Sequence, residues 1–319
     1  MSKNIVCFGG GNAMPRAVLM PLKKYPVNIA SVATMVDNGG STGQLRQDFG
    51  ILPPGDIRRH ILALSEAPKW KKELWNFRFG HESFGNGNKG HTFANIFIAG
   101  LQTSLKDYKK VLEILHEFME VKGKVLPATI DNAHLCAELQ NGKTVIGEDK
   151  IDVPEKRRKC MKIKSIYLEP KASAYPPVLE AIQKADAIII GPGDLYTSLI
   201  PCIIPEGAKE AMQKTKAKKI LVCNLMTKHG ETDNFSVMDF VKETEKCLGC
   251  ALDFVIYNNK IPSKERIAKH KKEHPLALEP LNIDNGLDKK KFIGSDLLPE
   301  SGEIIHDAEK LGKLIYSIL

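Results

Sequence analysis

The sequence predicts an α/β fold: a Rossmann-like, doubly wound, mostly parallel sheet with a helical insertion and an edge hairpin. Three observations lead to this prediction. Several short runs are apolar throughout and rich in β-branched residues, which is typical of strands buried on both faces. Segments with helical periodicity alternate with these runs. Four of the runs end in Gly, Asp or Asn, and ligands bind at the carboxyl edge of such sheets.

The buried strands are predicted from apolar composition, and the helices between them from the spacing of apolar residues. The predicted strands cover residues 4–8, 28–36, 187–190, 219–224 and 253–257. The predicted helices cover residues 14–24, 177–184, 206–214, 236–248 and 302–319.

Residues 68–122 break the alternation of strands and helices. Two helical patterns, 91–105 and 107–121, follow each other there with no strand between them. We therefore predict a helical insertion within a single domain of residues 1–319.

A hairpin is predicted around Asn141-Gly142, a dipeptide typical of type I′ turns. It lies between the strand-like segments 132–139 and 144–148. We expect this hairpin to extend the sheet at one edge.

The composition excludes several classes of protein. Of 319 residues, 43% are hydrophobic and 26% are charged, so the chain is not intrinsically disordered. No apolar run approaches the roughly 20 residues of a membrane span, and residues 5–8 are too short for a signal peptide. Seven scattered cysteines do not form a disulfide framework, and the lone Cys247–Cys250 pair favours packing over zinc binding. We expect a cytoplasmic protein.

The net charge of +8 favours anionic partners such as phosphorylated metabolites, nucleic acids or anionic membrane surfaces. The basic residues concentrate in segments 155–164, 264–272 and 289–291, where no aromatic residues interleave as a nucleic-acid stacking platform requires. Nucleic acid is therefore not the expected partner. A homo-oligomer is expected.

Loops after four predicted strands should converge at the carboxyl edge of the sheet. Glycine-rich turns there can direct backbone amides at a phosphate. Met14 stands where a third glycine would complete GxGxxG, and GxxxxGK[ST] is absent, so nicotinamide enzymes and P-loop NTPases are disfavoured. The candidate ligand-binding residues in these loops are Gly9, Gly10, Gly11, Asn12, Asp37, Asn38, Gly39, Gly40, Ser41, Gly191, Gly193, Asp194, Tyr196, Thr197, Ser198, Asn224, Met226 and Thr227.

Asp37 is the only carboxylate in the second of these loops, and it has two readings of equal weight. It bridges to a phosphate through Mg²⁺, or it caps the loop in an Asx turn. Arg46 is either a bidentate phosphate ligand or a solvated helix residue. Asp56 is a candidate N-cap, and Arg58 is a cation for a phosphate or for Asp56.

His91 and Asn95 lie four residues apart on one predicted helix and therefore share a face. Because the surrounding sequence is apolar, pattern alone slightly favours a buried core histidine. A role in the ligand site is the alternative.

These motifs, in this order, resemble one family. They are 9–11, 37–41, 50–58, 90–91 with Asn95, 191–198, 223–227 and 230–232. The chain resembles the YvcK-like "gluconeogenesis factor" proteins of the CofD-like superfamily over nearly its whole length. That resemblance implies a Rossmann-like fold with a helical insertion and a nucleotide-sugar site of the UDP-N-acetylglucosamine type. It also implies links to carbon metabolism, cell-wall precursor control and cell shape.

The chain departs from the family pattern at four places. Asn12-Ala13 replace Thr-Gly, Asn38 replaces a second aspartate, Asp194 replaces a serine, and Lys228-His229 replace Gln-Pro. These departures bear on metal use and on the ligand, since one carboxylate is lost and another is gained.

The resemblance leaves two hypotheses of different kinds. The first is a regulatory protein that binds a nucleotide sugar without consuming it. The alternative, implied by the CofD-type relatives, is a metal-dependent transferase of a phosphoryl-linked group from a nucleotide diphosphate donor. Asn38 and the lack of an evident nucleophile–base pair in the sequence favour the first.

Overall fold

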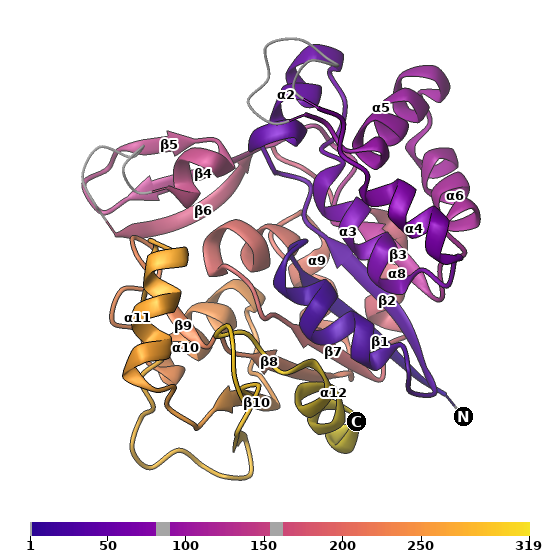
Figure 1. The fold of residues 1–319 in the computed structure, drawn as a ribbon. Helices are drawn as coiled ribbons and strands as arrows, with labels where there is room; N and C mark the ends of the chain where they lie inside the picture. The colour runs from indigo at the N-terminus through magenta and orange to yellow at the C-terminus, as the bar shows by residue number, and fades with distance from the viewer. Residues whose placement is uncertain (1, 81–89, 154–161) are drawn as a thin grey trace.

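The computed structural model describes residues 2–80, 90–153 and 162–319. A seven-stranded sheet forms its centre, in the order β12-β10-β8-β7-β1-β2-β3, and every neighbouring pair is parallel (Figure 1). The doubly wound α/β prediction is confirmed. The strands are β1 (Lys3–Gly9), β2 (Val27–Ala33), β3 (Lys124–Pro127), β7 (Ala187–Ile190), β8 (Lys218–Val222), β10 (Phe254–Asn258) and β12 (Phe292–Ser295).

The strand order reverses between β1 and β7. The chain runs from β1 outward through β2 to β3, and later from β7 outward through β8 and β10 to β12. Loops at the carboxyl ends of β1 and β7 therefore diverge to opposite faces and leave a crevice between them. All four residues of β7 are buried, which explains why apolar composition alone located this strand.

Helices cover both faces of the sheet. On one face α3 and α12 contact the segment after β1, and on the other α9 contacts α8 and α10. The helices are α2 (Gly40–Phe49), α3 (Gly55–Leu64), α4 (Lys69–Asn76), α5 (Phe93–Leu105), α6 (Tyr108–Phe118), α7 (Glu148–Asp152), α8 (Pro176–Gln183), α9 (Ala208–Lys214), α10 (Val237–Leu248), α11 (Lys264–Glu273) and α12 (Ala308–Ile318).

The predicted helix 14–24 is irregular. It consists of a π-helical turn, η1 (Pro15–Leu19), followed by the short α1 (Met20–Leu22). Pro21 has no backbone N–H to donate within an α-helix, which explains why regular hydrogen bonding is interrupted there. The final helix begins at Ala308, so the prediction from residue 302 was too long.

Helices α4, α5 and α6 occupy the predicted insertion, within the connection from β2 to β3 (Figure 1). Trp75 is fully buried there, with its ring centroid 6.4 Å from that of Phe97 and 6.2 Å from that of Phe118. The insertion therefore has its own aromatic packing. Its treatment as part of one domain stays a prediction.

The predicted hairpin forms, but in another place. Strands β4 (His134–Leu139) and β5 (Thr144–Ile146) join β6 (Ile163–Glu169) in a separate antiparallel sheet, seen at the upper left of Figure 1. The prediction of an extension of the central sheet was wrong because β4 pairs with β6 instead of with a strand of the central sheet.

The turn of this hairpin also differs from the prediction. Leu139 N donates to Lys143 O at 2.8 Å, so the loop has three residues. Gly142 is left-handed, with φ of 78°, and Asn141 is not. A type I′ turn needs positive φ at both central residues, so the turn type was wrong.

The basic segments and the lengths of the helices concern the partners that the sequence predicts. Strands β9 (Met226–Lys228) and β11 (Ala277–Pro280) pair antiparallel near α11, a helix without buried residues that carries the basic segment 264–272. Most of the basic segment 155–164 lies outside the described residues. Within the described part of the chain, every helix is too short or too polar to cross a membrane.

Candidate functional site

A pocket of about 470 Å³ lies at the carboxyl ends of β1, β2 and β7, where the strand order reverses. Twelve of the predicted site residues line it: Gly11, Asn12, Asp37, Gly39, Gly40, Ser41, Asp56, Arg58, Asn95, Asp194, Thr197 and Ser198. Three of the four loops that the sequence placed at one edge are thus brought together, and the predicted residues of the fourth, Asn224, Met226 and Thr227, do not line the pocket. Further lining residues, absent from the predicted set, include Thr34, Thr42, Gly55, Arg59, Arg78, Glu148, Asp149 and Asp152.

Some of the remaining predicted residues shape the loops without lining the pocket. A Cβ on Gly10 would lie 2.6 Å from Ser198 Oγ, so only glycine allows these loops to approach so closely. Asn224 holds the loop after β7, because its side chain accepts from Gly193 N at 3.0 Å and donates to Gly193 O at 2.9 Å. The others of this kind are Gly9 and Gly191.

Three more predicted residues lie away from the pocket lining. The Tyr196 hydroxyl is 3.4 Å from a carboxylate oxygen of Glu243. Thr227 Oγ1 donates to a backbone carbonyl of β11 at 3.1 Å. Met226 packs in a small cluster with Leu298. These side chains fix β9 and the loop after β7.

Arg46 has neither of the roles predicted for it. It is buried, and Nη1 donates to Asn38 Oδ1 at 2.6 Å. Nη2 donates to Asn132 Oδ1 at 2.7 Å and to Ala133 O at 2.6 Å. The guanidinium thus fastens α2 to the chain before β4. The amide of Asn38, standing in place of a carboxylate, is part of this clamp.

Asp37 forms the Asx turn of one predicted reading, and the reading as a Mg²⁺ bridge to a phosphate stays a prediction. Its Oδ1 accepts from Gly39 N at 2.8 Å, which is the Asx turn, and the same side chain lines the pocket. Burial raises its pKa, against the backbone hydrogen bond from Gly39 and the charge of Arg59. Such a carboxylate is favoured in its charged form by a nearby cation.

Asp56 is not an N-cap, which was one of the roles offered for it. The N-cap of α3 is Pro54, and Asp56 is the second helical residue. Burial, and then the charge of Asp37, raise the pKa of Asp56 to about 7. Arg59 Nη1 lies 3.4 Å from Asp56 Oδ1. The carboxyl group therefore changes charge near neutral pH.

Helix α7 brings three more carboxyl groups to the pocket: Glu148, Asp149 and Asp152. Burial, followed by the charges of Asp37 and Asp152, raises the pKa of Glu148 to about 9. This helix has only five residues, too few for a periodic signal, so its contribution was missed. The cluster of Glu148, Asp149 and Asp152 on a short stretch was the available signal.

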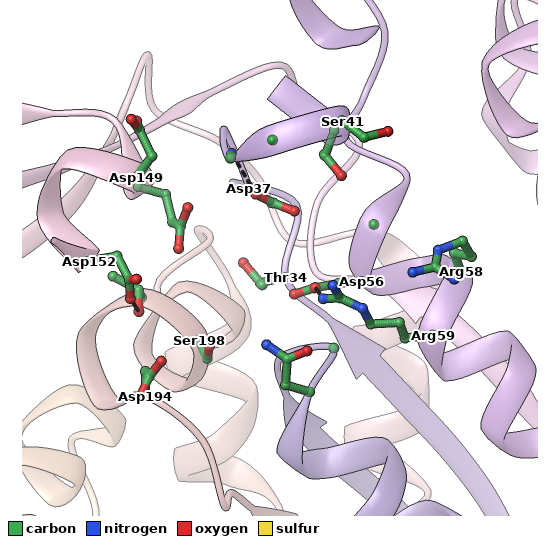
Figure 2. Close-up of a pocket in the computed structure, with 18 of the residues that line it drawn as sticks. Thr34, Asp37, Ser41, Asp56, Arg58, Arg59, Asp149, Asp152, Asp194 and Ser198 are labelled. Atoms are coloured by element: carbon green, nitrogen blue, oxygen red, sulfur yellow. Dashed lines mark hydrogen bonds and ion pairs between the residues drawn. The ribbon is translucent and has the colours of Figure 1, made fainter. Parts of the chain in front are cut away.

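The pocket is divided electrostatically. Figure 2 shows Asp149, Asp152 and Asp194 on one side and Arg58 and Arg59 on the other. Arg78 also lines the pocket. The pKa of Arg58 falls to about 10 through burial and repulsion from Arg59 and Arg78. The arginines therefore form a concentrated positive wall that an anion would stabilise.

Two helix N-termini add to this positive wall. Helix α2 begins at Gly40 and α3 at Gly55, and neither N-cap residue supplies a side-chain hydrogen bond. Residues of both first turns line the pocket. Amides in the first turn of a helix lack intrahelical partners and favour phosphate groups.

Three side chains form a chain of hydrogen bonds between the first turn of α2 and the start of α5. Ser41 Oγ lies 2.8 Å from His91 Nδ1, and Asn95 Nδ2 donates to Ser41 Oγ at 3.0 Å. Ser41 and Asn95 line the pocket, whereas His91 does not. Sequence reasoning found no such hydroxyl–imidazole pair because Ser41 and His91 are fifty residues apart.

Lys228 links helix α7 to the loop after β7, and so holds together the acidic wall of the pocket, which consists of Asp149, Asp152 and Asp194. Its ammonium forms ion pairs with Asp152, with Asp194 at 2.9 Å and with Glu231 at 2.9 Å. The three carboxylate oxygens lie within 4.8 Å of one another. Burial lowers the pKa of Lys228, but the combined charge of the three carboxylates outweighs this and raises it, so Lys228 stays protonated and fixes α7 against the pocket.

Three buried polar atoms of pocket residues have no hydrogen-bond partner within the described part of the chain. They are Thr34 Oγ1, Arg58 Nε and Asn95 Oδ1. An unsatisfied buried polar atom costs about 1–3 kcal/mol, so each requires an explanation. A bound polar ligand supplies one.

Comparison with known proteins gives consistent results. The sequence profile of the family described as "2-phospho-L-lactate transferase CofD" matches residues 5–296. A relative from Thermotoga maritima is 39% identical, with 98% of both chains covered. The "Gluconeogenesis factor" of Bacillus subtilis is 33% identical over 99% of this chain and 98% of its own. A crystal structure of a UPF0052 family member from Bacillus halodurans has a TM-score of 0.89 and 34% identity, covering 99% of both chains.

Proposed function

The chain belongs to the CofD family, within the group of the gluconeogenesis factors, and we propose that it is a regulatory protein that binds a nucleotide diphosphate sugar in this pocket. The names of these relatives support a link to carbon metabolism. UDP-N-acetylglucosamine is the first candidate ligand because of the family resemblance.

The division of the pocket into a positive and an acidic wall is the observation that carries this proposal. Arg58, Arg59 and the N-termini of α2 and α3 suit a diphosphate, which would have two or more negative charges. The carboxylates opposite can accept hydrogen bonds from sugar hydroxyls. The volume of about 470 Å³ falls in the usual range for small-molecule sites.

The residues of the pocket also fit Mg²⁺. The acidic donors are all oxygens, which this ion prefers, and Asp37 has a pKa raised by burial. Asp37 would hold the ion between its carboxylate and the diphosphate. The ion would supply positive charge between two anions that otherwise repel in a partly dry crevice. Binding through a single ordered water is the alternative for Asp37.

Binding without consumption is the favoured reading because Asn38 hydrogen-bonds to Arg46 and supplies no second carboxylate beside Asp37. One observation favours the transferase alternative. The pKa values of Asp56 and Glu148, about 7 and 9, suit general acid–base work at a pocket.

Two measurements test the proposal. Calorimetry with uridine and guanosine diphosphates and their sugars, with and without Mg²⁺, should detect binding of at least one. No binding of any of them at millimolar concentration contradicts the proposal. Phosphorus NMR with Mg²⁺ and a panel of alcohols should show an unchanged ligand. Steady formation of a phosphodiester and nucleoside monophosphate would instead establish the transferase.

A further inference from the structure

Asn95 is held rigidly at the edge of the pocket. It lies in the first turn of α5, where its backbone N donates to Oγ1 of the N-cap Thr92 at 3.2 Å. Only 4% of its surface is exposed, yet the residue lines the pocket. A side chain in this position has little contact with bulk solvent.

The orientation of the Asn95 amide is fixed by its neighbours. Burial lowers the pKa of His91, so its imidazole is neutral, and in the tautomer with the proton on Nε2 its Nδ1 accepts the Ser41 hydroxyl proton at 2.8 Å. Ser41 Oγ then has only lone pairs left, and Asn95 Nδ2 donates to them at 3.0 Å. Turning the amide over would bring Asn95 Oδ1 against these lone pairs, which repel it.

This arrangement leaves Asn95 Oδ1 as a fixed acceptor. The oxygen is buried and has no hydrogen-bond partner among residues 2–80, 90–153 and 162–319. We propose that Asn95 Oδ1 accepts a hydrogen bond from an O–H or N–H group of the bound nucleotide diphosphate ligand, and so selects ligands that carry a donor there. The proposal rests on the proposed function, and Ser41 and His91 are its positioning residues.

The donor should lie next to the diphosphate. Ser41, the partner of Asn95, is in the first turn of α2, where the helix N-terminus favours a phosphate group. The hydroxyls nearest the diphosphate are those of the ribose on one side, and on the other side the nearest substituent is the one at carbon 2 of the sugar. A ligand without a donor at the recognised position leaves Oδ1 unpaired, and the loss should exceed that of a solvent-exposed contact.

Matched ligands and variants test this. Calorimetry compares uridine diphosphate with its 2′-deoxy and 3′-deoxy forms, and UDP-glucose with UDP-2-deoxyglucose. In the wild type, removal of one of these three hydroxyls should weaken binding about tenfold. Asn95→Leu keeps most of the volume and removes the acceptor. The ratio of the dissociation constants, deoxy ligand over hydroxyl ligand, should therefore fall to about one. Asn95→Ser is a second variant, in case the leucine disturbs folding.

Three further variants complete the experiment. Ser41→Ala and His91→Gln should lower the selectivity ratio, because the Asn95 amide can then turn, whereas purely structural roles would leave the ratio unchanged. Thr103→Val, on the same helix but outside the pocket, should keep the wild-type ratio.

The outcomes separate this inference from the proposed function. Two results overturn only the inference. In the first, the wild type binds uridine diphosphates but no ratio exceeds twofold. In the second, Asn95→Leu and Asn95→Ser keep the wild-type ratios. If the wild type binds none of these compounds, the uridine form of the proposed function fails and the inference fails with it.

Discussion

The ammonium of Lys228 lies 2.9 Å from Oδ2 of Asp194, and both residues occupy positions where the chain departs from the pattern of the family it resembles. The departure at one position therefore compensates the departure at the other. Asp194 lines the pocket, and Lys228 also pairs with Asp152 of α7 and with Glu231. This ion cluster fixes the acidic wall relative to the loop after β7.

Lys228→Met should destabilise the fold strongly. The substitution leaves Glu231, whose side chain is 1% exposed, as a buried carboxylate without its counter-charge. Breaking such a buried pair costs about 3 kcal/mol or more. Chemical denaturation measures the loss. Lys228→Met combined with Glu231→Gln removes both charges and should recover much of it, and an unchanged loss in this double variant contradicts the explanation.

The sequence predicted those parts of the fold that depend on local patterns. The limits of β7 were predicted to the residue because all four side chains are buried. The helix predicted over 236–248 is α10, which begins one residue later because Ser236 is its N-cap, in a capping box with Asp239. Strand β6 was missed since its residues alternate irregularly between buried and exposed positions. Local sequence does not specify which sheet such a strand joins.

The candidate site, like the fold, could be predicted only where local sequence and topology determine it. Loops that follow the parallel strands could be placed together by topology, and half of their predicted residues line the pocket. Contacts between distant segments could not be predicted, such as Lys228 with Asp152 or Ser41 with His91. Arg46 was misassigned because nothing near it in the sequence indicates that Asn132 and Ala133 would receive its guanidinium.

Arg46 and Arg59 should behave as opposites when each is replaced by methionine. Arg46→Met removes three hydrogen bonds of a buried side chain and should lower the free energy of unfolding by about 3 kcal/mol, with only a small change in ligand affinity. Arg59→Met should weaken nucleotide diphosphate binding roughly tenfold and change stability little, because the Arg59 side chain is partly exposed. Denaturation and calorimetry on both variants check this, and the reverse pattern would show that the roles are misassigned.

The stability of the unliganded protein should fall as the pH rises from 6 to 9. Burial raises the pKa of Asp56 to about 7 and of Glu148 to about 9, both above the values of about 4 in an unfolded chain. The unfolded state therefore releases these protons first, and folding becomes less favourable as the pH rises through 7 and 9. Glu148→Gln cannot ionise and should lose less stability, so its melting temperature should exceed that of the wild type at pH 9. Equal pH dependence of melting in the two proteins contradicts this assignment.

Asp37 can be tested with two substitutions that separate its two roles. Asn in place of Asp37 keeps an oxygen that can accept from Gly39 N, so the turn survives while the negative charge is lost. Asp37→Asn should therefore abolish the Mg²⁺ dependence of nucleotide binding and leave the melting temperature within a few degrees. Asp37→Ala removes the turn as well and should lower the melting temperature further. Ligand titrations with Mg²⁺ and with EDTA, on the wild type and both variants, measure the first effect, and thermal melts measure the second. Wild-type affinity that does not respond to Mg²⁺ or EDTA would remove the ion from the proposal and leave Asp37 with the turn and an ordered water.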